Sequence, residues 1–67
     1  MTLRYAVTLE FTREHPETVR GILSVDNARL GARRAVDAAF TAHPNRHWSS
    51  LSILLERCEE PHDDTAA

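Results

Sequence analysis

The side chains that could carry out covalent chemistry are one cysteine and four histidines: Cys58, His15, His43, His47 and His62. A thiol beside an imidazole is a common arrangement for nucleophilic catalysis. However, no helix N-terminus or glycine-rich turn lies close to Cys58 in the sequence to stabilise a thiolate. We therefore interpret Cys58 as a structural or incidental cysteine, and we expect no catalytic residues.

Metal and cofactor chemistry have equally little support. A single cysteine cannot form an internal disulfide and is one ligand short of a cysteine-pair zinc site. His43 and His47 are four residues apart, but a proline after His43 interrupts the helix that would align them. The chain has two glycines, too few for a phosphate-binding loop. We expect no metal, no cofactor and no enzymatic activity.

Nucleic-acid binding is an alternative because all eight basic residues are arginines. Guanidinium groups contact phosphates, and an aromatic ring can stack on a base. The candidate residues are Arg29, Arg33, Arg34 and Arg46, the last in the segment Arg46-His47-Trp48. The net charge of −2 opposes this reading, since dedicated nucleic-acid-binding proteins are usually strongly basic. The arginine usage is also explained by codon bias alone.

The length and composition bound the fold. A chain of 67 residues allows one small domain. The 42% hydrophobic and 27% charged content is typical of a globular protein. No apolar run approaches the ~18 residues that span a bilayer, and the N-terminus lacks the pattern of a secretory signal. With the lone cysteine, these features predict a cytoplasmic protein without membrane contact.

The C-terminal residues differ in composition from the rest of the chain. Residues 59–67 contain four acidic residues, no lysine or arginine and no large apolar side chain. Such a segment cannot bury enough apolar surface to fold. The sequence therefore predicts one domain over residues 1–58 and an acidic disordered tail over residues 59–67.

Hydrophobic alternation predicts three strands. Residues 2–12 alternate with a period of two, which places residues 3, 5, 7, 9 and 11 on one face. Residues 18–25 and 47–58 are predicted as the second and third strands, with a turn around Pro16. Pairing Phe11 with Val19 would place Glu10 opposite Arg20 in the hairpin.

A helix is predicted over residues 28–42. Its apolar side chains recur at helical spacing, and they are Ala32, Ala35, Val36, Ala39 and Phe40. Asp26 or Asn27 can cap its N-terminus, and Pro44 disfavours helical geometry at His43.

These elements predict an α+β fold: a single ββαβ domain with a three-stranded antiparallel sheet in the order 2-1-3. A right-handed crossover from the second strand through the helix favours the third strand beside the first. One helix packs on one face of the sheet. The expected core consists of Leu3, Tyr5, Val7, Leu9, Phe11, Val19, Leu23, Val25, Val36, Phe40, Leu51, Ile53 and Leu55.

The other face of this sheet has no helix to cover it. The residues predicted there have apolar members, Ala6, Ile22, Trp48 and Leu54, inside a charged rim of Arg4, Glu10, Arg20 and Glu56. An apolar centre with a polar rim is typical of an interaction surface. Two alternatives remain: exposed apolar residues are common on any protein, and a bulge near residues 49 and 50 would turn Trp48 into the core.

We therefore predict a small non-enzymatic protein-binding module, such as a subunit, adaptor or inhibitor. It would act through the uncovered sheet face or a sheet edge, as a homodimer or with another protein. The predicted partner-binding residues are Trp48, Ile22, Leu54, Arg20 and Arg4. The alternative is a weak nucleic-acid binder that uses the arginine-rich helix and the loop around Arg46.

Overall fold

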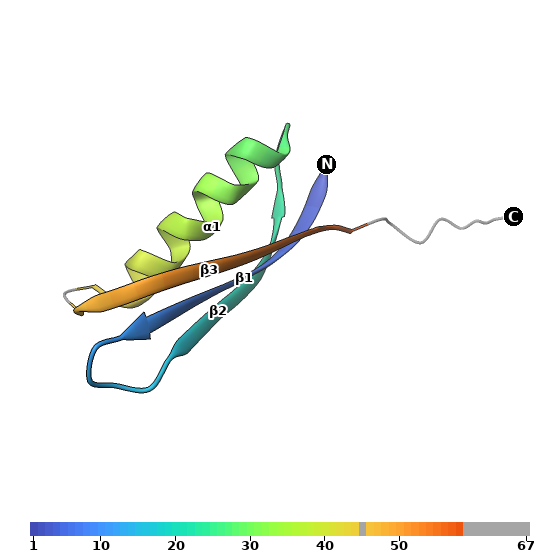
Figure 1. Ribbon diagram of the computed structural model, residues 1–67. Coiled ribbons are helices and arrows are strands. Elements are labelled where there is room, and N and C mark those ends of the chain that lie inside the picture. Colours follow the sequence, from blue (N-terminus) through green and yellow to red (C-terminus); the bar gives the residue numbers. More distant parts are fainter. Residues whose placement is uncertain (45, 59–67) are drawn as a thin grey trace, which may run out of the picture.

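The chain folds as three strands and one helix in the computed structural model, which describes residues 1–44 and 46–58 (Figure 1). In chain order they are β1 (Thr2–Phe11), β2 (Glu17–Ser24), α1 (Ala28–Ala42) and β3 (Trp48–Arg57). Both β2 and β3 pair antiparallel with β1, so the sheet order is β2-β1-β3. The predicted α+β fold and its ββαβ topology are confirmed. The predicted tail lies outside the described residues.

The central strand β1 supplies most of the core. Its side chains alternate between the helix side and the uncovered side of the sheet, and every helix-side member is buried. These residues are Leu3, Tyr5, Val7, Leu9 and Phe11. Because β1 has a neighbouring strand on each side, its backbone is hydrogen-bonded along both edges.

Small residues bring α1 close to the sheet. Ala35 and Ala39 are fully buried, and a β-carbon at Gly31 would overlap the Leu3 side chain. The predicted helix boundaries are confirmed. The Leu30 backbone N–H donates to Asn27 Oδ1 over 2.8 Å, so Asn27 is the N-cap.

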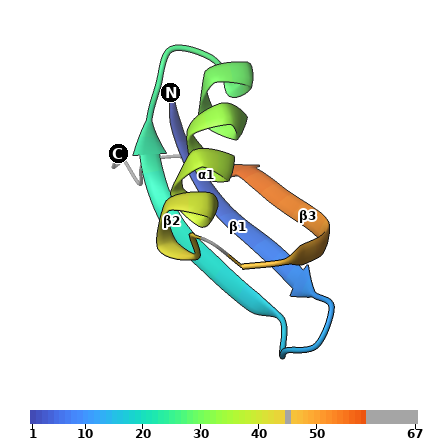
Figure 2. The same cartoon turned by 90° about the vertical axis from the view of Figure 1, so that its left-hand side faces the viewer.

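One helix does not cover the whole helix side of the sheet. Figure 2 shows α1 lying over β1 and β2, with β3 to one side, and its packing contacts follow the same division. Ile53 on β3 lies opposite Val7 and therefore faces the helix side, yet it is 40% exposed. The expectation that Ile53 is a core residue is wrong, because α1 does not extend over it.

The predicted hairpin register is also wrong. Val19 lies opposite Val7 rather than Phe11, and Arg20 lies opposite Ala6 rather than Glu10. Both registers place the same side chains on each face, so the alternation cannot distinguish them. The observed register places Gly21 opposite Tyr5. The Tyr5 ring fills the space above Gly21 that a side chain would otherwise occupy.

We predict that Gly21→Ala destabilises the protein by about 1–3 kcal/mol, the usual range for overpacking. A β-carbon at position 21 would lie 2.5 Å from the Tyr5 hydroxyl and 2.7 Å from two ring carbons. Urea unfolding followed by circular dichroism measures the change in free energy. In a Tyr5→Leu background the same substitution should cost less. An equal loss in both backgrounds would show that the ring is not the cause.

Candidate functional site

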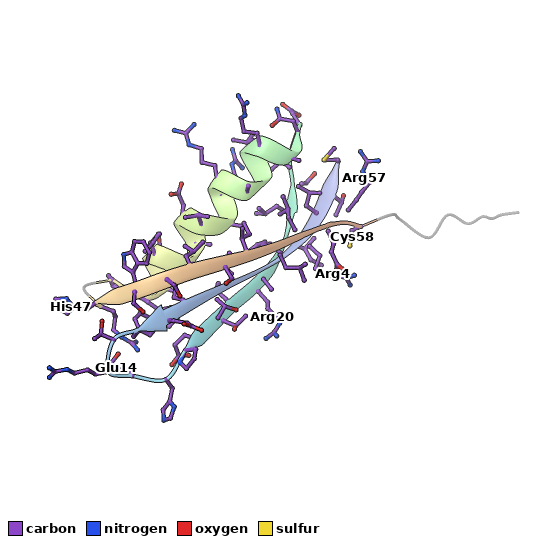
Figure 3. All side chains as sticks on the ribbon, in the orientation of Figure 1. Arg4, Glu14, Arg20, His47, Arg57 and Cys58 are labelled. Atoms are coloured by element: carbon purple, nitrogen blue, oxygen red, sulfur yellow. The ribbon has the colours of Figure 1, made fainter. Side chains whose placement is uncertain are left out.

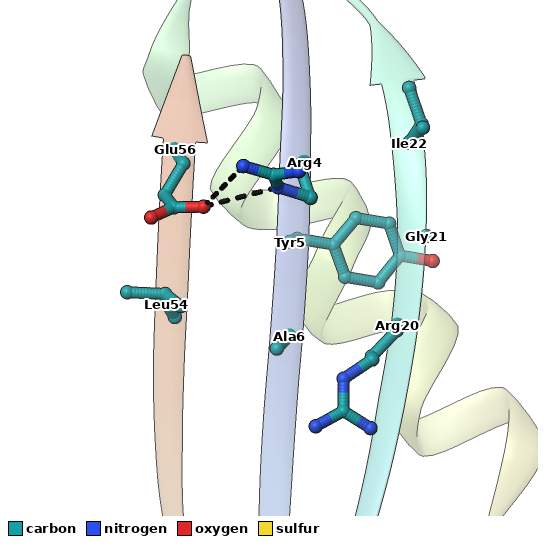
Figure 4. Close-up of a pocket in the computed structure, with 8 residues that line it drawn as sticks. All are labelled: Arg4, Tyr5, Ala6, Arg20, Gly21, Ile22, Leu54 and Glu56. Carbon is teal, nitrogen blue, oxygen red and sulfur yellow. Dashed lines mark hydrogen bonds and ion pairs between the residues drawn. The ribbon is translucent and has the colours of Figure 1, made fainter. Parts of the chain in front are cut away.

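The side of the sheet opposite α1 forms the candidate site. Arg4 and Arg20 project from this side (Figure 3). The register sets two neighbouring rows across the three strands: Ile22, Arg4 and Glu56 in one, and Arg20, Ala6 and Leu54 in the other. Together they line a shallow hollow of about 410 Å³, which we call the open-face patch (Figure 4).

The centre of the open-face patch is apolar. Ile22 on β2 is 65% exposed and Leu54 on β3 is 56% exposed. Ala6 on β1 lies between these two strands and leaves the space above it empty, because its side chain is a single methyl group. Leu54 therefore lies directly beside a gap, and Ile22 lies diagonally across it, in the neighbouring row. A partner that covered them would gain roughly 25 cal/mol for each Å² of apolar surface removed from water.

The charged side chains of the patch differ in their pairing. Arg4 Nε donates to Glu56 Oε1 over 3.1 Å, and Arg4 Nη2 forms an ion pair with the same oxygen at 3.0 Å. The pair is exposed, so its contribution to stability is small, but it holds both side chains in place along the rim. Arg20 has no acidic partner within residues 1–44 and 46–58. Its guanidinium group is therefore available to a carboxylate from outside the described part of the chain.

The predicted place of Trp48 on this face is wrong. The pairing of β1 with β3 shifts between Glu10 and Phe11, so that Glu10 lies opposite Ser50 and Phe11 lies opposite Trp48. The extra residue, Ser49, forms a β-bulge that turns Trp48 to the helix side. The bulge that the sequence left open as an alternative is confirmed.

Two serines stabilise this bulge. Ser49 Oγ donates to the Glu10 carbonyl oxygen and Ser50 Oγ donates to Glu10 Oε1, each over 3.1 Å. On the helix side, the Trp48 ring packs edge-on against Phe40, with 5.5 Å between ring centroids. Half of Trp48 remains exposed, so it closes the end of the core without being enclosed by it.

Arg46 contacts two residues that are distant from it in the sequence. Its guanidinium group lies 4.2 Å from the centroid of the Phe11 ring and pairs with Glu14 Oε1 over 2.6 Å. Glu14 lies in the β1–β2 turn, at the end of the sheet away from Arg4 (Figure 3). Arg46 thus links the turn to the core. Only a long-range contact produces this arrangement, and the local sequence carries no signal for it.

The other residues of the alternative nucleic-acid surface lie on α1. Arg29, Arg33 and Arg34 are exposed. The acidic residue Asp37 is exposed on the same helix. The structure therefore leaves three arginines accessible and pairs the fourth, Arg46, with a carboxylate.

In the described part of the chain, Cys58 and the possible metal ligands do not form a common site. Cys58 is half-buried beyond the end of β3, and its backbone N–H donates to the Thr2 carbonyl oxygen over 2.8 Å. Within residues 1–44 and 46–58, no three His, Cys, Asp or Glu side chains are grouped as metal ligands. The described helix, with 15 residues, is too short and too polar to cross a membrane.

Comparison of the chain with protein-family models, with curated proteins and with solved structures finds no match. The function must therefore be inferred from the residues themselves. Of the five predicted partner-binding residues, the structure brings four together in the open-face patch: Arg4, Arg20, Ile22 and Leu54. Glu56, predicted only as part of the rim, joins them through its ion pair with Arg4.

We predict that Trp48→Ala lowers the free energy of unfolding by about 1–2 kcal/mol. An edge-to-face aromatic pair contributes about 0.5–1.5 kcal/mol beyond the apolar area it buries. Trp48→Phe keeps a ring against Phe40 and should lose less. Urea unfolding followed by circular dichroism compares the two variants. If Trp48→Ala unfolds at the same urea concentration as the natural protein, the contact with Phe40 has no energetic role.

Proposed function

We propose that the chain is a small non-enzymatic protein-binding module that docks a partner protein on the open-face patch. The observation that carries the proposal is the pair of exposed aliphatic side chains on the two edge strands, Leu54 beside Ala6 and Ile22 diagonal to it. A sheet face exposed only to water would carry polar side chains at these positions. An apolar centre inside a charged rim matches the anatomy of protein interfaces.

The patch also indicates the chemistry of the partner. The gap over Ala6 fits one apolar side chain inserted between Ile22 and Leu54. Arg20 lies beside this gap and has no carboxylate partner in the described part of the chain, so an acidic group on the partner would neutralise it. We therefore infer that the partner presents an apolar side chain next to an aspartate or glutamate.

This function needs no catalytic group, metal or cofactor, and it is compatible with a subunit, an adaptor or an inhibitor. A cytoplasmic setting is part of the proposal, since a chain with one cysteine gains nothing from an oxidising compartment. Weak nucleic-acid binding through Arg29, Arg33 and Arg34 is the alternative outcome, and the experiment below separates the two.

A library of displayed random peptides tests the proposal directly. Selection on the immobilised protein should enrich peptides that carry an apolar residue next to an acidic one. The double variant Ile22→Thr/Leu54→Thr should weaken their binding at least about tenfold, a loss of roughly 1.4 kcal/mol. Threonine favours strands, so the sheet should remain intact. Arg33→Gln, on the exposed side of α1, is the matched control and should leave binding unchanged.

Two results would overturn the proposal. One is the absence of any enriched peptide, and the other is equal binding of the enriched peptides by the double variant. A labelled single-stranded oligonucleotide provides the parallel measurement. Binding that is lost on addition of salt and on Arg33→Gln would favour the nucleic-acid alternative instead.

A further inference from the structure

The outer edge of β3 has unpaired backbone groups at defined positions. The Cys58 N–H bonds to the Thr2 carbonyl oxygen, and Thr2 and Cys58 continue the register of β1 with β3. In an antiparallel ladder, hydrogen-bonded pairs alternate with non-hydrogen-bonded pairs. From Ser50 to Glu56, beyond the bulge, the even-numbered residues of β3 therefore bond to β1. Leu51, Ile53, Leu55 and Arg57 direct their N–H and C=O groups away from the sheet.

Between the bulge at Ser49 and the charged residues Glu56 and Arg57, this edge lacks the features that normally prevent strand pairing. Natural edge strands are interrupted by proline, lysine, bulges or inward charges. From Leu51 to Leu55, β3 reads Leu-Ser-Ile-Leu-Leu, with neither a charge nor a proline. The opposite edge, β2, follows Pro16 and has Gly21 at its middle, opposite Tyr5. Of the two edges, β3 is the one suited to pairing with a further strand.

The sequence of β3 is complementary to a second copy of itself. In an antiparallel pair, residues that face each other must lie on the same side of the sheet. A two-fold axis at Ile53 places Ile53 opposite Ile53 of the second copy, and Leu51 opposite Leu55 of the second copy. All three helix-side residues then face apolar residues. Sliding the strands by two residues in one direction places Arg57 opposite Leu51 of the second copy. Sliding them by two residues in the other direction places Leu55 opposite Ser49 of the second copy.

The other side of β3 accepts the same register. Leu54 faces Ser52 of the second copy, and Glu56 faces Ser50 of the second copy. No two like charges lie opposite each other. The register that satisfies the helix side therefore introduces no repulsion on the open face.

We propose that two copies of the chain associate through their β3 edges, antiparallel and centred on Ile53, to form a six-stranded sheet. The exposure of Ile53, which α1 leaves uncovered, supports a second copy of the chain as the partner. In the dimer, Ile53 of each copy would pack against Ile53 of the other. Edge pairing without face-to-face packing gives a small interface, so the dimer should dissociate on dilution.

The dimer would also affect partner binding by the open-face patch, and this part of the inference rests on the proposed function. Leu54 and Leu54 of the second copy become diagonal neighbours, roughly 7–8 Å apart. The two open-face patches would then form one continuous apolar strip across the six strands. A partner segment that lies across the strip could engage both copies at once, which increases its apparent affinity without new contacts.

Charge substitutions at the axis test the proposal. Ile53→Lys and Ile53→Glu each place two like charges opposite each other, so each variant should be monomeric. An equal mixture of the two should form a heterodimer, because lysine then faces glutamate. Sedimentation equilibrium over a range of concentrations measures the mass against the 7.6 kDa monomer. Ile22→Lys, an exposed isoleucine on the other edge strand, is the matched control and should remain dimeric.

A cysteine variant provides evidence that does not depend on charge. In the chain with Cys58→Ser, Ile53→Cys should oxidise readily to a disulfide-linked dimer. Hydrogen-bonded antiparallel residues have Cα atoms about 5.5 Å apart, within the range of a disulfide. Leu54→Cys in the same background should oxidise more slowly, since Leu54 faces Ser52 of the second copy.

A natural protein that stays monomeric at high micromolar concentration would overturn the β3 dimer. The β3 dimer would also be overturned if Ile53→Lys or Ile53→Glu remained dimeric, or if the equal mixture of the two variants did not associate. The selected peptides separate this failure from failure of the proposed function. A monomeric Ile53→Lys variant should still bind them through its own patch, whereas Ile22→Thr/Leu54→Thr should dimerise and fail to bind them.

Discussion

A single helix is too narrow to cover a sheet of three strands. With its side chains, an α-helix is about 10 Å wide, and strands are spaced about 4.8 Å apart, so one helix covers roughly two of them. In this protein α1 lies over β1 and β2. The middle of β3 on the helix side, at Ile53, and the whole opposite face of the sheet are left without cover, and the other features of the molecule follow from this.

The consequence for stability is a core built almost entirely on β1. The central strand bonds to a neighbour along each edge and buries its helix-side row beneath the small residues of α1. Gly31, Ala35 and Ala39 allow close approach but bury little apolar area of their own. Domains of this size bury a smaller share of their surface than larger ones. A partner on the open-face patch or along β3 would supply burial that the chain itself lacks.

Local signals were sufficient to predict the elements, and long-range contacts were not visible in the sequence. The helix over residues 28–42 was predicted because its cap, its apolar stripe and its terminating proline all lie within it or beside it. The hairpin register depends on Tyr5 crossing Gly21, and an even shift leaves the alternation unchanged. Trp48 was misplaced because one bulge reverses the side of every residue beyond it. The sequence predicts Arg46 only as a candidate phosphate contact, because its actual partners, Glu14 and Phe11, are distant in sequence.

If the edge of β3 is a free pairing surface, residue-resolved amide hydrogen exchange along β3 should depend on protein concentration. In dilute solution, the amides of Ser52 and Leu54 should exchange slowly, because they bond to β1, whereas those of Leu51, Ile53 and Leu55 should exchange fast. At high protein concentration the second group should become protected and the first should change little. Rapid exchange of Leu51, Ile53 and Leu55 at every concentration would show that the edge of β3 does not pair with a second copy.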